Sequence, residues 1–458
     1  MPSVDAVIVG GGIAGLAAAY ELSQHGTSFV VLERASRAGG VIVSEEIDGY
    51  TIDGGADALL IQKPEGIRLC EEIGLGPRLI PTKPPRLAYV QRGGRLYALP
   101  AASVLGIPTR IGPFARSGLF SWAGKLRMGA ELLVPRRRNE QDESIGAFIT
   151  RRFGAEATTY LAEPLLAGIH AGDVDRLSVR ALFPRLAKAE SKHGSVIRAF
   201  RSTPEPRTPN PGGAFRSLPG GLSEMVRALV NAIGPAGIRL NTGASAITGP
   251  GPFVVRTPTG DAIDARAVVL ATPAYVTSEL TRNRDEELAR LSGEIPYASA
   301  GTVALAFRRS AIAHPLNGSG FVVPRVEHTG ILASSWLSSK WAHRAPEDRV
   351  LLRTFVGGAR DPDALEQSDE ALVERSIAAL TRLLGIRGEP VLARVYRFER
   401  GNAQHEVGHL ARMAAIDCAL ARHPGLYVTG SGFRGVGIPD CVADGRATAR
   451  QVVAWLAQ

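Results

Sequence analysis

"VIVGGGIAGLAAAYEL" (residues 7–22) decides how this chain folds. Its first three residues are apolar and predict a strand buried on both faces, and its alanine-rich end predicts a helix. Between them, Gly10, Gly12 and Gly15 have the spacing G-x-G-x-x-G. One glycine makes the tight turn, one lets the backbone approach phosphate oxygens, and one lets helix and strand pack closely. The stretch therefore predicts a dinucleotide site with the diphosphate at the helix N-terminus.

An acidic residue and a second pair of glycines strengthen this prediction. "SFVVLER" (28–34) predicts a second strand, and Glu33 stands where a carboxylate accepts the ribose hydroxyls of an adenosine. An acid there disfavours NADP, which carries a 2′-phosphate at that place. Arg37 would neutralise phosphate or, alternatively, stay a solvated loop charge. The further cofactor contacts predicted in this part of the chain are Arg34, Arg37, Gly39 and Gly40.

The C-terminal part of the chain is again rich in glycine. Residues 425–456 begin with a short apolar strand, continue through a glycine-rich turn and end in a long helix. Two nucleotide-contacting segments at opposite ends of one chain suit a large ligand that lies across the fold, which favours FAD over NAD. The cofactor contacts predicted beyond the first forty residues are Ala246, Gly430, Gly435, Val436, Gly437 and Ile438.

Composition limits the class of protein. The chain has 458 residues, of which 45% are hydrophobic and 21% charged, as expected for a soluble globular protein of two or three domains. It contains no apolar, uncharged stretch of about 18 residues, and the first strand leaves no room for a signal peptide. Cys70, Cys418 and Cys441 are scattered, so we expect no metal site, no disulfide and a cytoplasmic location. The net charge of +9 favours anionic partners, but no nucleic-acid motif accompanies it.

The segment from residue 101 to 212 differs from the rest. In its first part, residues 102–138, arginines and lysines alternate with large apolar side chains. Glu131 is the single acid of this basic stretch. Such a basic, amphipathic stretch suits an anionic membrane surface, with Arg136, Arg137 and Arg138 as a cationic cluster. A helical subdomain whose basic side faces water is the alternative, and both interpretations stay open.

Longer motifs give the chain a family likeness. They are "AGIHAGDVDRLS" (167–178), "QHEVGHLARM" (404–413) and "GSGFRGVGIPDCV" (430–442). With them and the glycine motif, the chain resembles the monoamine oxidase-like FAD superfamily. Within it, the chain is most similar to the oxygen-dependent protoporphyrinogen oxidases and their coproporphyrinogen-oxidising relatives. The likeness covers nearly the whole chain, and the stretch at 167–178 is its most specific part.

This resemblance implies an α/β chain, α+β overall, in three parts. Alternating apolar residues between 296 and 400 separately predict an antiparallel sheet. The parts are a discontinuous Rossmann-type FAD-binding domain (1–84, 213–295 and 401–458), an antiparallel-sheet substrate domain (85–100 and 296–400) and a helical membrane-associating domain (101–212).

The resemblance implies the oxidation of protoporphyrinogen IX to protoporphyrin IX in haem synthesis. Six electrons pass through non-covalently bound FAD to O2, which becomes H2O2, and coproporphyrinogen III is the alternative substrate. Hydride transfer to a flavin needs apolar walls and cations for the propionates more than reactive side chains. This agrees with a sequence in which no Ser-His-Asp, Cys-His or paired-carboxylate arrangement stands out.

The resemblance also places substrate contacts. Arg86 matches an arginine that pairs with a propionate, and a surface salt bridge is its alternative role. Gly168 matches a glycine whose backbone carbonyl accepts a proton near the reacting carbon, or which serves close packing. Ser319 stands where many protoporphyrinogen-specific relatives place a stacking Phe, which leaves room for four propionates. Val322 corresponds to an apolar pocket residue.

Four further polar residues keep two interpretations each. His170 is a candidate base, but a place in the core or the pocket wall is favoured for it. Lys340, His343 and Arg344 would bind extra carboxylates or face solvent.

Rival functions exist on the same fold. A flavin amine oxidase would need an aromatic cage, and several attach flavin through a cysteine, for which no site is evident; a desaturase is a related alternative. A non-enzymatic lipid-escort protein would tend to lose the diphosphate loop and its acid, which this chain keeps. The resemblance leaves open a peripheral contact with the inner face of the cell membrane, a homodimer and hand-off of the product to a ferrochelatase.

Overall fold

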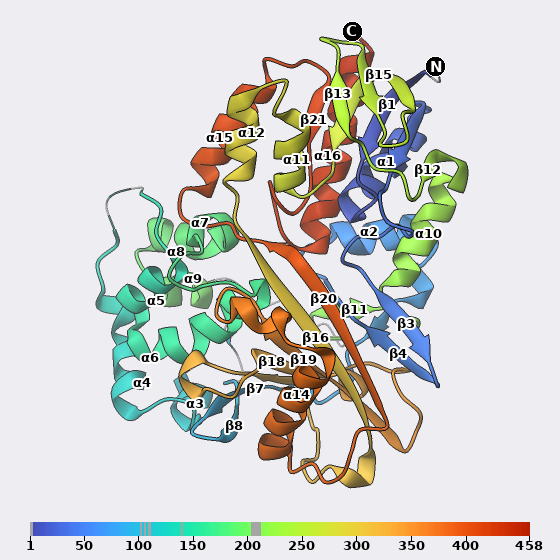
Figure 1. Cartoon of the computed structure of the whole chain (residues 1–458). Coiled ribbons are helices and arrows are strands. Elements are labelled where there is room, and N and C mark those ends of the chain that lie inside the picture. Colours follow the sequence, from blue (N-terminus) through green and yellow to red (C-terminus); the bar gives the residue numbers. More distant parts are fainter. Residues whose placement is uncertain are drawn as a thin grey trace.

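The computed structural model describes residues 3–100, 103–104, 107–108, 111–137, 139, 141–202 and 212–458. Figure 1 shows one β-sheet at the top of the molecule, a second sheet below it and a cluster of helices at the side. Both chain ends lie at the top, next to the first sheet. The predicted α/β fold class is confirmed. Arg138, from the predicted cationic cluster, lies outside the described residues.

The first sheet is built around its most buried strand. β1 (Ser3–Val9) pairs in parallel with β2 (Phe29–Leu32) on one side and with β15 (Ala262–Leu270) on the other. Its middle residues are fully buried, as predicted for a central strand of a parallel sheet. The other strands of this sheet are β12 (Ile238–Arg239), β21 (Leu426–Val428) and the antiparallel strands β13 (Ala246–Thr248) and β14 (Phe253–Arg256).

Two helices from opposite ends of the chain pack against each other beside this sheet. α1 (Ile13–Gln24) follows β1, and α16 (Ile438–Leu456) follows β21. Gly445 makes their close approach possible, because a Cβ atom there would lie 2.2 Å from the carbonyl oxygen of Ala14. The N-terminal and C-terminal segments therefore form one packed unit.

The second sheet is antiparallel except at one pair of strands. β17 (Gly320–Val322) and β7 (Ala88–Arg92) are parallel neighbours. The helix α14 (Asp369–Leu384) packs its apolar side on this sheet. The remaining strands of the sheet are β8 (Arg95–Ala98), β16 (Tyr297–Arg308), β18 (Ala333–Trp336), β19 (Arg349–Gly357) and β20 (Leu392–Ala403).

The helices of the middle segment share one apolar cluster, which also contacts the second sheet through Val322. Among the described residues, no helix has both the length and the apolar character needed to cross a membrane. The helices of this part are α3 (Ile111–Arg116), α4 (Trp122–Gly129), η2 (Ala130–Leu133), α5 (Ile145–Phe153), α6 (Ala155–Ala157), η3 (Thr158–Ala167), η4 (Gly168–His170), α7 (Val179–Leu182), α8 (Pro184–His193) and α9 (Val196–Ser202).

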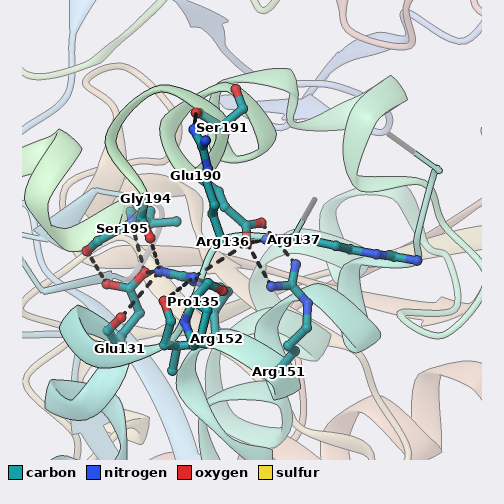
Figure 2. A network of polar contacts seen from close by, with 12 residues as sticks. Glu131, Pro135, Arg136, Arg137, Arg151, Arg152, Glu190, Ser191, Gly194 and Ser195 are labelled. Atoms are coloured by element: carbon teal, nitrogen blue, oxygen red, sulfur yellow. Dashed lines mark hydrogen bonds and ion pairs between the residues drawn. The ribbon is translucent and has the colours of Figure 1, made fainter. Parts of the chain in front are cut away.

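A buried ion pair holds these helices together (Figure 2). Glu131 and Arg152 are both 0% exposed, and Nε of Arg152 donates to Oε1 of Glu131 at 2.8 Å. The same carboxylate accepts the backbone N–H groups of Val196 and Ile197 at the start of α9. The single acid of the basic stretch therefore joins η2, α5 and α9.

Two arginines of the predicted cationic cluster belong to the same network (Figure 2). Arg137 pairs with Glu143 at 3.2 Å, and its N–H donates to Glu190. Arg136 donates to the carbonyl oxygen of Ser191 at 3.4 Å. Both side chains therefore make internal contacts, which reduces the charge that they offer to an external surface.

Replacing Arg152 by Met will destabilise the helical part by about 3–5 kcal/mol, because the Glu131 charge stays buried without its partner. Urea denaturation of the two proteins measures the difference. The control is Arg290→Met, which removes an exposed pair with Glu294 and costs less than about 1 kcal/mol. Equal losses from the two substitutions would show that the buried pair has no special role.

Candidate functional site

The glycine turn after β1 opens onto free space at the N-terminus of α1. Gly10 has a φ of +108°, which favours glycine, and a Cβ at Gly15 would lie 2.0 Å from the carbonyl oxygen of Gly10. A Cβ at Gly12, in contrast, would meet no atom within 4 Å. The first N–H groups of α1 have no partner within the helix and carry partial positive charge. The turn therefore offers an anion both space and donors.

Glu33 ties the end of β2 to this turn. Its Oε2 accepts the N–H of Gly11 at 2.7 Å, and its Oε1 accepts the N–H of Ala35 at 2.8 Å. Each carboxylate oxygen has a further lone pair, so the group can still accept ribose hydroxyls. Glu33 thus shapes the loop as well as facing the predicted ribose site. The next residue, Arg34, is exposed.

The second glycine pair packs against the first turn. The N–H of Gly39 donates to the carbonyl oxygen of Gly11 at 2.8 Å, and Gly40 has a φ of +58°. Arg37 donates to the carbonyl oxygens of Gly40 at 2.6 Å and Ile42 at 3.1 Å. Its guanidinium therefore stabilises the loop backbone, a role that the sequence alone did not indicate.

The glycine-rich turn at 430–438 reaches the same place from the other end of the chain. Gly437 is the N-cap of α16, which begins at Ile438. A Cβ at Gly430 would lie 3.7 Å from the Cβ of Ala14, in the first turn of α1. The start of this turn therefore lies beside the N-terminal end of α1.

Ala246 lies on β13, where it pairs with β14. The residues that reach the strand of Glu33 come slightly earlier in the chain. Asn241 donates its N–H to the carbonyl oxygen of Ala35 at 2.9 Å, and Thr242 donates to that of Glu33 at 2.8 Å. Sequence reasoning missed them because a polar Asn-Thr-Gly stretch is typical of any surface turn.

These residues fit a dinucleotide. The free space at Gly12, the two helix N-termini and the Glu33 carboxylate share the carboxyl edge of a parallel sheet, which is where such ligands bind. Glu33 would hold the ribose, and the N–H groups after Gly12 would hold the diphosphate. The turn at 430–438 would contact the rest of the molecule.

Three predicted substrate contacts lie on or just before the neighbouring strands β7 and β17. β7 and β17 are paired, and the N–H of Ser319 donates to the carbonyl oxygen of Leu87 at 2.8 Å. Arg86 precedes Leu87 and is exposed, with its Nε donating to the carbonyl oxygen of Thr82 at 3.1 Å. Val322, on β17, packs against the apolar cluster of the helical part.

Gly168 stands at the end of an unusual helix. The ten residues of η3 form a π-helix that contains Pro164, and Gly168 begins the short turn η4. π-Helical geometry is rare and is concentrated at functional sites. The carbonyl oxygen of Gly168 accepts the N–H of Ala171 at 3.0 Å, which leaves one lone pair for another donor.

His170 lies close to both predicted sites. Its ring contacts Phe183 edge-on, and its carbonyl oxygen accepts from Gln404 at 3.0 Å. Burial, together with the positive charge of Lys63, lowers the pKa of His170 to about 4. Lys63 is paired at 2.6 Å with Asp440 of α16. The segment that follows Gly168 therefore borders the cofactor helix, with a histidine that is neutral at pH 7.

The interpretation of Lys340 and Arg344 as substrate-binding or solvent-facing cations is wrong. Arg344 is buried and pairs with Asp53 at 2.9 Å, and Lys340 pairs with Asp57 at 2.6 Å. Burial raises the pKa of Asp57, but Lys340 and Arg353 outweigh it and hold this pKa well below its usual range. Both cations neutralise carboxylates from the segment between β4 (Tyr50–Asp53) and α2 (Glu65–Glu72).

His343 is exposed, as one of its two interpretations requires. It lines a cavity of about 310 Å³ together with Arg309 and Arg349. Within the described part of the chain, the lining of this cavity includes neither Arg86 nor Ser319.

Known proteins share this architecture and much of this sequence. The family model described as flavin containing amine oxidoreductase matches residues 13–453. The coproporphyrinogen III oxidase of Bacillus subtilis is 33% identical over 98% of both chains. The chloroplastic protoporphyrinogen oxidase of Nicotiana tabacum is 29% identical over 99% of this chain and 86% of its own. A crystal structure from Exiguobacterium sp. 255-15, provisionally named a protoporphyrinogen oxidase, is 32% identical, with a TM-score of 0.88 over 100% of both chains.

Replacing Glu33 by Ala will weaken FAD binding, because the ribose loses an acceptor and the glycine turn loses its contact at Gly11. We expect the Kd to rise about 10- to 100-fold, as for the loss of a charged hydrogen bond of about 1.5–3 kcal/mol. Flavin fluorescence during titration of the apoprotein measures it. Glu71→Ala, at an exposed carboxylate of α2, is the control and leaves the Kd unchanged. An unaltered Kd in Glu33→Ala would remove Glu33 from the site.

Proposed function

Because this chain belongs to the flavin containing amine oxidoreductase family, we propose that it oxidises a porphyrinogen, with coproporphyrinogen III as the preferred substrate. As a member of that family it is an FAD-dependent oxidoreductase, which sets aside the non-enzymatic lipid-escort alternative. One observation carries the function: the segment 168–178 meets the cofactor turn 430–438 through Gln404 and His405. The most family-specific motif thus borders the cofactor site.

The residues of this site suit the oxidation of an apolar, carboxylate-bearing ring. A bound flavin supplies the acceptor for hydride, and we take O2 as the final acceptor, with H2O2 as its product. Val322 and the helical cluster behind it provide an apolar wall. Arg86 would bind a propionate, since a guanidinium keeps its charge at every working pH. The carbonyl oxygen of Gly168 would accept a proton as hydride leaves.

Two features favour coproporphyrinogen III, which bears four propionates, over protoporphyrinogen IX, which bears two. The relatives named coproporphyrinogen III oxidase share 33% of their residues with this chain, and the plant protoporphyrinogen oxidase shares 29%. Ser319 is a small, half-buried hydroxyl residue just before β17 and is hydrogen-bonded to Leu87, the neighbour of Arg86, so the mouth of the site lacks a stacking ring at that position. Protoporphyrinogen IX, placed first from the sequence alone, is the second candidate.

Supplying each porphyrinogen to the FAD-loaded protein in air tests this function. We expect porphyrin fluorescence from both, with a kcat/KM at least about tenfold higher for coproporphyrinogen III. Arg86→Ala should raise KM about tenfold at unchanged FAD content, as for the loss of a charged hydrogen bond. Arg95→Ala, at an exposed arginine of β8, is the matched control. A flavin-loaded protein that oxidises neither compound would refute the function, and the reverse preference would assign protoporphyrinogen IX.

We also propose that the helical part, within the domain at 101–212, rests on an anionic membrane surface. Trp122, Leu126 and Leu133 are 70%, 74% and 85% exposed, and all three lie on α4 and η2. Lys125 lies beside them, with its Nζ 4.2 Å from the centre of the Trp122 ring. Exposed apolar side chains gathered on one short segment indicate a contact surface, and the neighbouring lysine favours anionic headgroups.

The double variant Trp122→Ser, Leu126→Ser will lower partition onto vesicles that contain phosphatidylglycerol by at least about tenfold, because each side chain buries apolar area worth more than about 1.4 kcal/mol. Vesicle sedimentation measures the bound fraction, and added salt should weaken binding further. Leu410→Ser, at an exposed leucine of α15 (His409–Leu420), is the control. Unchanged partition would show that this segment faces water and does not bind the membrane.

A further inference from the structure

Two buried histidines hold the cofactor turn from one side. His405 and His409 are 2% and 1% exposed, with ring centroids 3.7 Å apart and ring planes at 11°. Nε2 of His405 donates to the carbonyl oxygen of Ser431 at 2.9 Å, and Nε2 of His409 donates to that of Phe433 at 2.7 Å. A carbonyl oxygen only accepts, so both Nε2 atoms carry a proton. The stacked pair therefore grips two carbonyl groups of the turn 430–438.

The backbone around the same pair reaches the other parts of the chain. The N–H of Ser178 donates to the carbonyl oxygen of His405 at 2.9 Å. The side chain of Gln404 donates to the carbonyl oxygen of His170 at 3.0 Å. The strand β20 ends at Ala403, so these residues continue directly from the second sheet. His405 thus stands where the substrate segment, the second sheet and the cofactor turn meet.

We propose that the stacked His405–His409 pair is a positioning device that sets the turn 430–438 against the segment 168–178, and that it holds only while both rings are neutral. This inference deepens the proposed function and rests on the assignment of the turn to FAD. Neither ring needs to touch substrate, so both are positioning residues.

The surroundings of the pair oppose protonation. Burial, together with the nearby His409 and His170, lowers the pKa of His405 to about 3, although the hydrogen bond to Ser431 acts in the opposite direction. Burial also lowers the pKa of His409, where the nearby charges of Arg412 and Asp142 act in opposite directions. Among the described residues, Nδ1 of His409 has no hydrogen-bond partner, so a proton there would be a buried, unpaired donor.

These shifts set the direction of the pH dependence. Histidine in an unfolded chain titrates near pH 6.5, whereas the folded chain keeps His405 neutral down to about pH 3. The unfolded chain therefore binds more protons between these values. Stability contributed by the neutral pair is complete above about pH 6.5 and is lost as the pH falls towards 3.

The turn has other supports as well: Oδ2 of Asp444 accepts the N–H of Gly430 at 3.1 Å. A Cβ at Gly432 would lie 2.5 Å from the hydroxyl of Tyr297, so this ring closes the turn on another side. That hydroxyl accepts the N–H of Ala274 at 2.8 Å, and burial raises the pKa of Tyr297 to about 12. Tyr297 stays uncharged over the whole range in which the histidines change.

The test compares Gln and Leu substitutions in the full-length, FAD-loaded protein. Glutamine keeps an N–H donor near the position of Nε2 and cannot gain a proton. We expect His409→Gln and His405→Gln to bind FAD within about threefold of the unchanged protein at pH 7.5. His409→Leu and His405→Leu, which lack the donor, should raise the FAD Kd about tenfold.

The acid titration supplies the second readout. The unchanged protein should release FAD as the pH falls from 6.5 towards 3, and the double Gln variant should release it at least one pH unit lower. His193→Gln, at an exposed histidine that ends α8, serves as the control for both measurements. The proposal is overturned if the Leu and Gln variants lose FAD or unfold to the same extent. It is also overturned if the double Gln variant releases FAD at the same pH as the unchanged protein. No porphyrinogen enters these measurements, so a failed substrate assignment would not alter their outcome.

Discussion

The carbonyl oxygen of Ala14 leaves no room for a side chain at Gly445, and this contact places α16 directly on α1. Because both helices start at the carboxyl edge of the same sheet, their positive ends point to one region. The rest of the site depends on this arrangement. Without it, the turn at 430–438 would not lie beside the N-terminal end of α1.

A second constraint fixes the substrate sheet relative to the cofactor. Asp53 ends β4 and Asp57 follows it. Their cationic partners are Arg353, on β19 of the second sheet, and Lys340 and Arg344, which lie between β18 and β19 in the chain. Buried ion pairs add little net stability compared with apolar side chains, but separating the partners is strongly unfavourable. The two sheets can therefore slide or rotate only if a buried charge is exposed or loses its partner, which holds β17 and the neighbouring Ser319 in place relative to the flavin site.

The sequence predicts those parts of this molecule whose residues lie close together along the chain. The turn at Gly10 and the acid at Glu33 lie within one strand-helix-strand unit, so their geometry follows from a short stretch of chain. Arg344 and Asp53 are far apart in sequence, and nothing local shows that one neutralises the other; this is why Arg344 was assigned to substrate or solvent. His405 and His409 escaped notice for the same reason, since their function depends on carbonyl groups of a turn more than twenty residues away.

The polar groups around the predicted reaction site are mostly held neutral or already paired. His170 and His405 are neutral because of burial. The carboxylate of Glu163 forms an ion pair with Arg360 and accepts the N–H of Arg325. Such an arrangement suits hydride transfer from an apolar ring, because free charges near the flavin would stabilise some redox states and trap protons. The protein's contribution is then to place the cofactor turn 430–438 against the segment 168–178 without free charge between them. A pair of stacked, neutral imidazoles performs that task with two hydrogen bonds, at a place where all three parts of the chain meet.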